Sequence, residues 1–129
     1  MPAINKRLES VNQQIQQALQ NHHRTNDSVK LLAVSKTRPI EDISQAYAAG
    51  QHYFGESYIQ EALTKIAQLK GLNIEWHFIG RIQGNKTRSI AENFDWVHSI
   101  DNPKQIRRLN DQRPSHLAPL NICLQIKIE

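Results

Sequence analysis

Hydrophobic residues recur with helical spacing at the start of the chain. Over residues 3–21, the apolar positions 4, 8, 11, 15, 18 and 19 share one face, and glutamines occupy much of the opposite face. This spacing is typical of an amphipathic helix. The polar stretch from Asn21 to Asp27 predicts a loop. Residues 1–27 are therefore expected to form a leading helix and loop, and residues 28–129 a series of βα units.

Short apolar runs beyond this loop predict strands at residues 29–34, 52–55, 74–79, 96–100 and 120–128. The first run is nearly continuous, which is typical of a strand buried on both faces, whereas the last alternates strictly. Helical stretches separate them. Pro39 suits a first helical turn, Ser57 and Gln60 fit a capping box, and Asp101 or Asn102 is expected to cap the last helix.

Strands that alternate with helices predict an α/β fold with parallel strands and right-handed crossovers. An open doubly wound sheet and a (β/α)₈ barrel both satisfy this order. The first strand is followed by SKTRP at residues 35–39, which is no glycine-rich phosphate loop and argues against a nucleotide-binding doubly wound domain. About five strands are too few for a complete barrel. We expect residues 1–129 to be the N-terminal part of one barrel domain, with an exposed strand edge that invites self-association.

Composition and charge narrow the class of protein. The chain has 39% hydrophobic residues, 22% charged residues and a net charge of +4, which indicates a soluble globular protein. We predict a cytoplasmic location, because the chain shows no membrane-length apolar run and no apolar leader, and its single cysteine, Cys123, cannot form an internal disulfide. The excess positive charge is spread along the chain, so we expect no nucleic-acid binding, although a small anionic ligand suits a basic protein.

Polar residues follow the predicted strands at their carboxyl ends, where parallel α/β proteins bind ligands. The most informative is Lys36, which follows the first apolar run after a single residue, Ser35. Its amine must emerge at the rim or lie partly desolvated, and burial of a lysine favours the neutral nucleophilic amine that forms Schiff bases. A surface lysine paired with Glu56 or Asp101 is the alternative. No ligand spacing such as C-x-x-C or H-x-x-x-H occurs, so we expect no metal site.

Segments at four strand ends resemble a known family. AVSKT at 33–37, HYFGESYIQEA at 52–62, WHFIGRIQGNK at 76–86 and VHSID at 97–101 are similar, in order and spacing, to the signatures of the pyridoxal phosphate homeostasis proteins. The resemblance implies a barrel like the N-terminal domain of alanine racemase. It also implies that pyridoxal 5′-phosphate is held as a Schiff base on Lys36, in a protein that stores or delivers the cofactor, with PLP-dependent enzymes as clients and no established turnover.

Two departures from the family pattern affect the expected site. Many members have asparagine after FGE, where this chain has Ser57, so Ser57 is a second cofactor-binding candidate or only a helix cap. The resemblance also implies that the phosphate and the pyridine nitrogen are held by residues beyond position 129, and we expect weak cofactor binding by residues 1–129 alone.

Two other functions remain open at this point. One is a Schiff-base enzyme of the racemase-like or aldolase-like class, and the other a basic domain that binds RNA or protein. An enzyme also needs an acid or base at the substrate carbon. His77 and His98 lie within predicted strands, where packing is the commoner role, and no catalytic residue is assigned.

Overall fold

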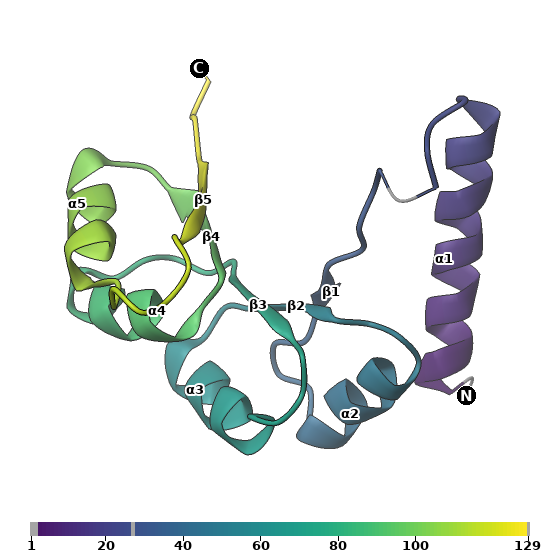
Figure 1. The fold of residues 1–129 in the computed structure, drawn as a ribbon, viewed down its shortest axis with the longest axis horizontal. Helices are drawn as coiled ribbons and strands as arrows, with labels where there is room; N and C mark the ends of the chain where they lie inside the picture. The colour runs from purple at the N-terminus through teal and green to yellow at the C-terminus, as the bar shows by residue number, and fades with distance from the viewer. Residues whose placement is uncertain (1–2, 27, 129) are drawn as a thin grey trace.

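A computed structural model describes residues 3–26 and 28–128, and its elements follow the predicted βα order (Figure 1). The elements are α1 (Ile4–Asn21), β1 (Ala33–Val34), α2 (Ile40–Ala48), β2 (Tyr53–Glu56), α3 (Ile59–Gln68), β3 (Glu75–Phe78), the 3₁₀ turn η1 (Gly84–Lys86), α4 (Thr87–Asn93), β4 (Trp96–Ile100), α5 (Pro103–Gln112) and β5 (Asn121–Leu124). None of the helices in the described part of the chain is long and apolar enough to cross a membrane.

The five strands form one parallel sheet in the order β1-β2-β3-β4-β5. Figure 1 shows the sheet as a curved wall, with α2, α3, α4 and α5 along its outer side. A doubly wound sheet reverses its strand order and carries helices on both faces. The unbroken order and the one-sided helices are those of a (β/α)₈ barrel, present here in part. The sheet therefore decides between the two architectures that the sequence pattern left open.

The core lies between the outer face of the sheet and the helices. Alternate strand residues point outward into it, and they meet apolar residues of the helices. The buried members include Phe54, Phe78 and Val97 from the strands and Ile43, Ala62, Ile90 and Leu109 from the helices. Burial of each of these side chains except that of Ala62 contributes about 1.5–3 kcal/mol. The intervening strand residues consequently face the concave side of the sheet.

The outer strands differ from the sequence prediction. The first strand was predicted over residues 29–34 with both faces buried, but β1 comprises only Ala33 and Val34, and Val34 is 53% exposed. The last was predicted over 120–128, but β5 ends at Leu124, and Ile126 and Ile128 are 77% and 90% exposed. Each of these strands pairs on one side only, so part of its apolar pattern has no packing partner.

Of the two predicted helix caps, the one on α5 is confirmed and the one on α3 is wrong. Asn102 caps α5, because its side-chain oxygen accepts a hydrogen bond from the Gln105 backbone N–H at 3.0 Å. The capping box predicted at Ser57 and Gln60 is absent from the described residues. Helix α3 begins at Ile59 with Tyr58 as its N-cap, and no side chain caps it. Ser57 instead lies in the short link between β2 and α3, where its backbone contacts the neighbouring loop at Gly80.

Candidate functional site

Lys36 lies at the carboxyl end of β1, in a tight turn. The turn is closed by a hydrogen bond of 3.1 Å from the Arg38 N–H to the Ser35 carbonyl. Thr37 has a φ of 64°, which is unusual for a β-branched residue. Ser35 is buried, whereas Lys36 is exposed. The chain therefore releases the Lys36 side chain at the rim, so the desolvated placement and the pairing with Glu56 or Asp101 are both wrong.

A buried ion cluster lies directly beneath this turn. The Lys65 Nζ donates to the carboxylate of Glu56 at 2.9 and 3.2 Å, to the Glu61 carboxylate at 2.8 Å and to the Ser35 carbonyl at 2.8 Å. Glu56 is fully buried, and Lys65 is 4% exposed. Four acceptor atoms around one ammonium satisfy a charge that would otherwise be very costly to bury.

The cluster anchors the residues on both sides of Lys36. On one side, the Ser35 hydroxyl donates a short hydrogen bond to the Glu56 carboxylate. On the other, the Thr37 backbone N–H donates to the Glu61 carboxylate at 2.6 Å. The hydrogen bond from Lys65, supported by that from Thr37, lowers the pKa of Glu61. The position of the Lys36 backbone is thus fixed from two directions by groups that are themselves paired.

Local sequence explains how these groups meet. Strands β1 and β2 pair with Val34 opposite Gly55, which places Ser35 beside Glu56 at the end of the sheet. Glu61 and Lys65 are four residues apart on α3, so they share one helix face. The sequence pattern did not predict this cluster. The available signal was Lys65 itself, a charged residue on the helix face that also carries Ala62 and Leu69.

The concave face of the sheet carries a second polar cluster. His77 Nδ1 lies 3.0 Å from His98 Nε2, and His77 Nε2 lies 2.9 Å from the Glu75 carboxylate. The rings of His77 and Trp96 stack at 5.5 Å. Burial, with a smaller contribution from the charge of His77, lowers the pKa of His98. The two histidines, for which packing was the expected role, are hydrogen-bonded to each other and line a hollow of about 510 Å³.

Ser57, the second sequence candidate, does not line that hollow. It lines a separate cleft between the loops that follow β2 and β3, together with Arg81 and Lys86. Lys36 is not among the residues that line either space. Lys36 and Ser57 therefore lie at the same edge of the sheet, but Ser57 lines a cleft to which Lys36 does not contribute.

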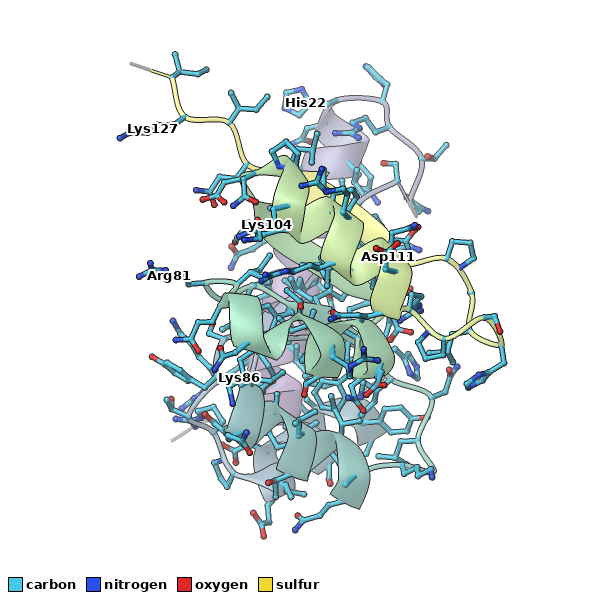
Figure 2. The ribbon with its side chains drawn as sticks, turned by 90° about the vertical axis from the view of Figure 1, so that its left-hand side faces the viewer. His22, Arg81, Lys86, Lys104, Asp111 and Lys127 are labelled. Carbon is cyan, nitrogen blue, oxygen red and sulfur yellow. The ribbon has the colours of Figure 1, made fainter. Side chains whose placement is uncertain are left out.

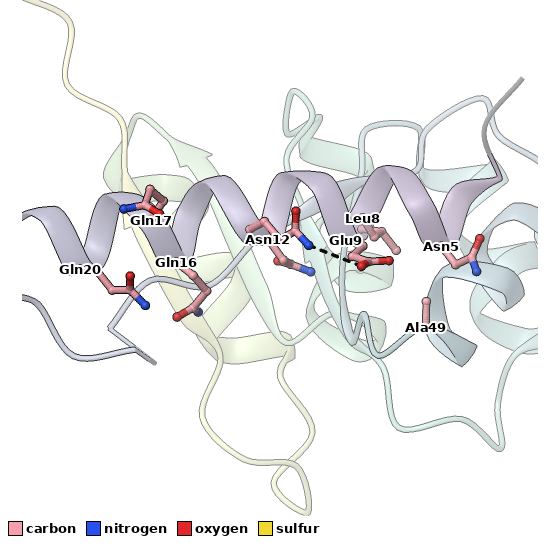
Figure 3. A pocket seen from close by; sticks show the side chains of 9 residues that line it. Asn5, Leu8, Glu9, Asn12, Gln16, Gln17, Gln20 and Ala49 are labelled. Atoms are coloured by element: carbon pink, nitrogen blue, oxygen red, sulfur yellow. Dashed lines mark hydrogen bonds between the residues drawn. The ribbon is translucent and has the colours of Figure 1, made fainter.

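A further hollow, of about 750 Å³, carries few reactive side chains (Figure 3). It runs along one face of α1 to Ala49 at the end of α2 and is lined mainly by amide side chains, with Glu9 as its one charged residue. Gln13 donates a hydrogen bond to Glu9 at 3.4 Å. Amides on an exposed helix face are solvated in place, so this surface gives no sign of a reactive site. In the described part of the chain, no three His, Cys, Asp or Glu side chains are grouped to hold a metal ion.

Comparison with known proteins places this geometry in a family. Residues 7–129 match the family model of the alanine racemase N-terminal domain. Pyridoxal phosphate homeostasis proteins of Pasteurella multocida and Escherichia coli K12 are 51% and 47% identical over 127 and 131 residues. These alignments include 97% and 99% of this chain but only 54% and 56% of the relatives. The chain thus spans about half the length of the curated relatives it matches.

Solved structures agree with this assignment. PipY of Synechococcus elongatus, determined with PLP bound, superposes with a TM-score of 0.71 at 41% identity, over 84% of this chain and 47% of PipY. Alanine racemase of Corynebacterium glutamicum, at 20% identity and a TM-score of 0.55 over 89% of this chain and 31% of that one, shares the fold. The resemblance seen in the sequence is confirmed: the chain belongs to the alanine racemase N-terminal domain family, and the relatives that match it at 47% to 51% identity are pyridoxal phosphate homeostasis proteins.

Proposed function

We propose that this chain carries the cofactor-attachment part of a pyridoxal phosphate-binding protein, with Lys36 as the attachment point. The observation that carries the proposal is the exposed amine of Lys36 at the carboxyl end of β1, on a turn tied to a buried ion cluster. Structural similarity to PipY, which was solved with PLP bound, supports it. In the reaction, Nζ adds to the aldehyde carbon and water leaves, which gives a Schiff base. Water or another amine reverses it.

The residues present fit this role. In the described part of the chain, the Lys36 side chain makes no hydrogen bond or ion pair, so its nitrogen is free to reach an aldehyde. Its neighbours Ser35 and Thr37 are held by Lys65 and Glu61, so the backbone that carries the amine is fixed before the cofactor arrives. Preorganisation of this kind lowers the entropy cost of binding.

We propose binding without turnover. The ionisable groups that hold the turn are Glu56, Glu61 and Lys65, and both carboxylates are paired with the Lys65 ammonium. A group that already forms a buried ion pair is poorly suited to exchange a proton with a substrate. The relatives are named for pyridoxal phosphate homeostasis, and storage or delivery of the cofactor, which we propose here, requires only reversible attachment. Delivery to PLP-dependent enzymes remains a prediction.

Covalent trapping tests the attachment point. The chain is mixed with pyridoxal phosphate, reduced with borohydride and digested, and the share of pyridoxyl adduct on each lysine is measured by mass spectrometry. Lys70 and Lys104 are exposed and serve as internal references. We expect the adduct to be enriched on Lys36 over both references, and enrichment that disappears in urea would show that the fold provides it. Equal labelling of all exposed lysines would refute the proposal.

A parallel assay separates binding from catalysis. Absorbance of the Schiff base is followed while amino acids are added, and racemisation and transamination products are measured in the same samples. We expect loss of the absorbance band by exchange, without product. Product that disappears in Lys36→Ala would establish the enzyme alternative instead.

A further inference from the structure

A cleft of about 570 Å³ opens beside the end of β2, separate from the Lys36 turn. Two loops build it: the one that links β2 to α3 and the one that links β3 to η1. Its lining residues are Ser57, Tyr58, Ile59, Gln60, Phe78, Gly80, Arg81, Gln83 and Lys86. All nine belong to the segments 52–62 and 76–86, two of the four that carry the family resemblance. Its volume is within the range of small-molecule sites.

Close backbone contact holds the two loops together. A Cβ on Gly80 would lie 2.2 Å from the Ser57 carbonyl oxygen, so only glycine allows this approach. Phe78 and Ile82, on either side of Gly80 in the chain, are 2% and 7% exposed and fix the β3 loop to the core. The cleft is therefore shaped before any ligand arrives.

The charged side chains that line this cleft are all positive. Arg81 and Lys86 both line it, and no lining residue carries a carboxylate. Neither cation makes a side-chain hydrogen bond or ion pair within residues 3–26 and 28–128. By contrast, Arg38 pairs with Asp42 at 3.0 Å. Figure 2 shows Arg81 and Lys86 on the same edge of the molecule.

We propose that this cleft is a second binding site, specific for a phosphate monoester. A phosphate monoester carries a charge of about −1.5 to −2 at neutral pH, which two cations match. The planar guanidinium of Arg81 can bind two phosphate oxygens at once, and the amides of Gln60 and Gln83 add donors. The ring of Tyr58, which is 54% exposed, offers a surface for the rest of the ligand. This site uses no atom of Lys36, so it stands independently of the proposed attachment of pyridoxal phosphate.

Titration followed by ¹H–¹⁵N NMR tests the site in the chain as it exists. The probes are inorganic phosphate and phenyl phosphate, which lack an aldehyde, with acetate as the singly charged comparison. We expect shifts in residues 57–60 and 80–86, strongest with phenyl phosphate and weakest with acetate. Arg81→Gln and Lys86→Gln should each weaken binding about tenfold, the effect of losing roughly one charge-assisted hydrogen bond. Lys104→Gln is the matched control, because Lys104 is an exposed lysine on α5 and outside the cleft.

Further arms separate the outcomes. Phosphate binding that persists in Lys36→Ala supports a second site even if trapping at Lys36 fails. Pyridoxal phosphate that shifts residues 57–60 in Lys36→Ala identifies the cofactor itself as a source of the phosphate. Equal weakening by Lys104→Gln and Arg81→Gln would mean general charge attraction and would overturn the proposal. Binding of a single-stranded oligonucleotide, without binding of phosphate or phenyl phosphate, would also overturn the proposal.

Discussion

The ion cluster beneath Lys36 makes a quantitative prediction about stability. Lys65→Met keeps most of the side-chain volume and removes the ammonium, which leaves the fully buried Glu56 carboxylate with one remaining hydrogen bond, from Ser35. Loss of one partner from a buried ion pair costs about 3–5 kcal/mol of unfolding free energy. An ordinary domain has about 5–15 kcal/mol in total. We therefore expect Lys65→Met to lower the urea midpoint strongly, with an unchanged m-value.

A double variant shows whether the unpaired charge is the cause. Lys65→Met combined with Glu56→Met removes both charges, and Ser35 keeps the Gly55 carbonyl, at 3.4 Å, as an acceptor. We expect the double variant to be more stable than Lys65→Met alone, because no buried carboxylate remains unpaired.

The matched control is an ion pair on the surface. Arg88 and Glu92 lie 4.0 Å apart, with side chains that are 66% and 45% exposed. Arg88→Met should change the unfolding free energy by less than about 1 kcal/mol. The reasoning fails if Lys65→Met costs no more than Arg88→Met, or if the double variant is no more stable than Lys65→Met alone.

Further predictions concern pH and the cleft wall. The hydrogen bond from the Lys65 ammonium lowers the pKa of Glu61 below 4.5. The ionised Glu61 carboxylate therefore contributes to stability above that pH, and this contribution is lost as the pH falls below it. Glu61→Gln should flatten the dependence of the urea midpoint on pH in this acid range. Burial lowers the pKa of His98 below 6.5. As the pH drops below 6.5, the unfolded chain therefore takes up the proton first, and the stability of the folded chain falls. His98→Asn should reduce that fall, and an unchanged pH profile of stability would contradict the role given to His98. Gly80→Ala should cost about 1–3 kcal/mol by thermal unfolding, since the new methyl group has no room. Gly71→Ala, with nothing within 4 Å of the added carbon, is the control and should cost far less.

Much of the fold could be predicted from the sequence because it depends on local periodicity. The apolar positions of residues 3–21 predicted α1, and Asn102, one of two cap candidates, marked the start of α5. The predicted bounds of β1 and β5 were wrong, because the length of a strand depends on whether neighbouring strands are present to pair with it. No pattern within residues 29–34 or 120–128 reports that.

One residue of the candidate site, Lys36, could be predicted from the sequence, but the residues that hold its turn could not. Lys36 was identified because it lies at the end of an apolar run, one residue beyond it, and within a segment that resembles the family. Glu61 and Lys65 were not identified, and Glu56 was considered only as a partner of Lys36, since 20 or more residues separate Thr37 and Ser35 from the groups that hold them. Pairing across such distances depends on strand register, which the sequence pattern does not specify uniquely.

The sequence by itself determined the succession of βα units, the amphipathic faces of the helices and the position of Lys36 at the end of a strand, because these follow from residue type and spacing. Only the tertiary structure decided that the five strands run in unbroken order, that a buried lysine on α3 holds the turn of Lys36, and that two loops meet at Gly80 to form a cationic cleft. The physical reason is that these features arise from contacts between segments far apart in the chain, whose free energy depends on distances that exist only after folding.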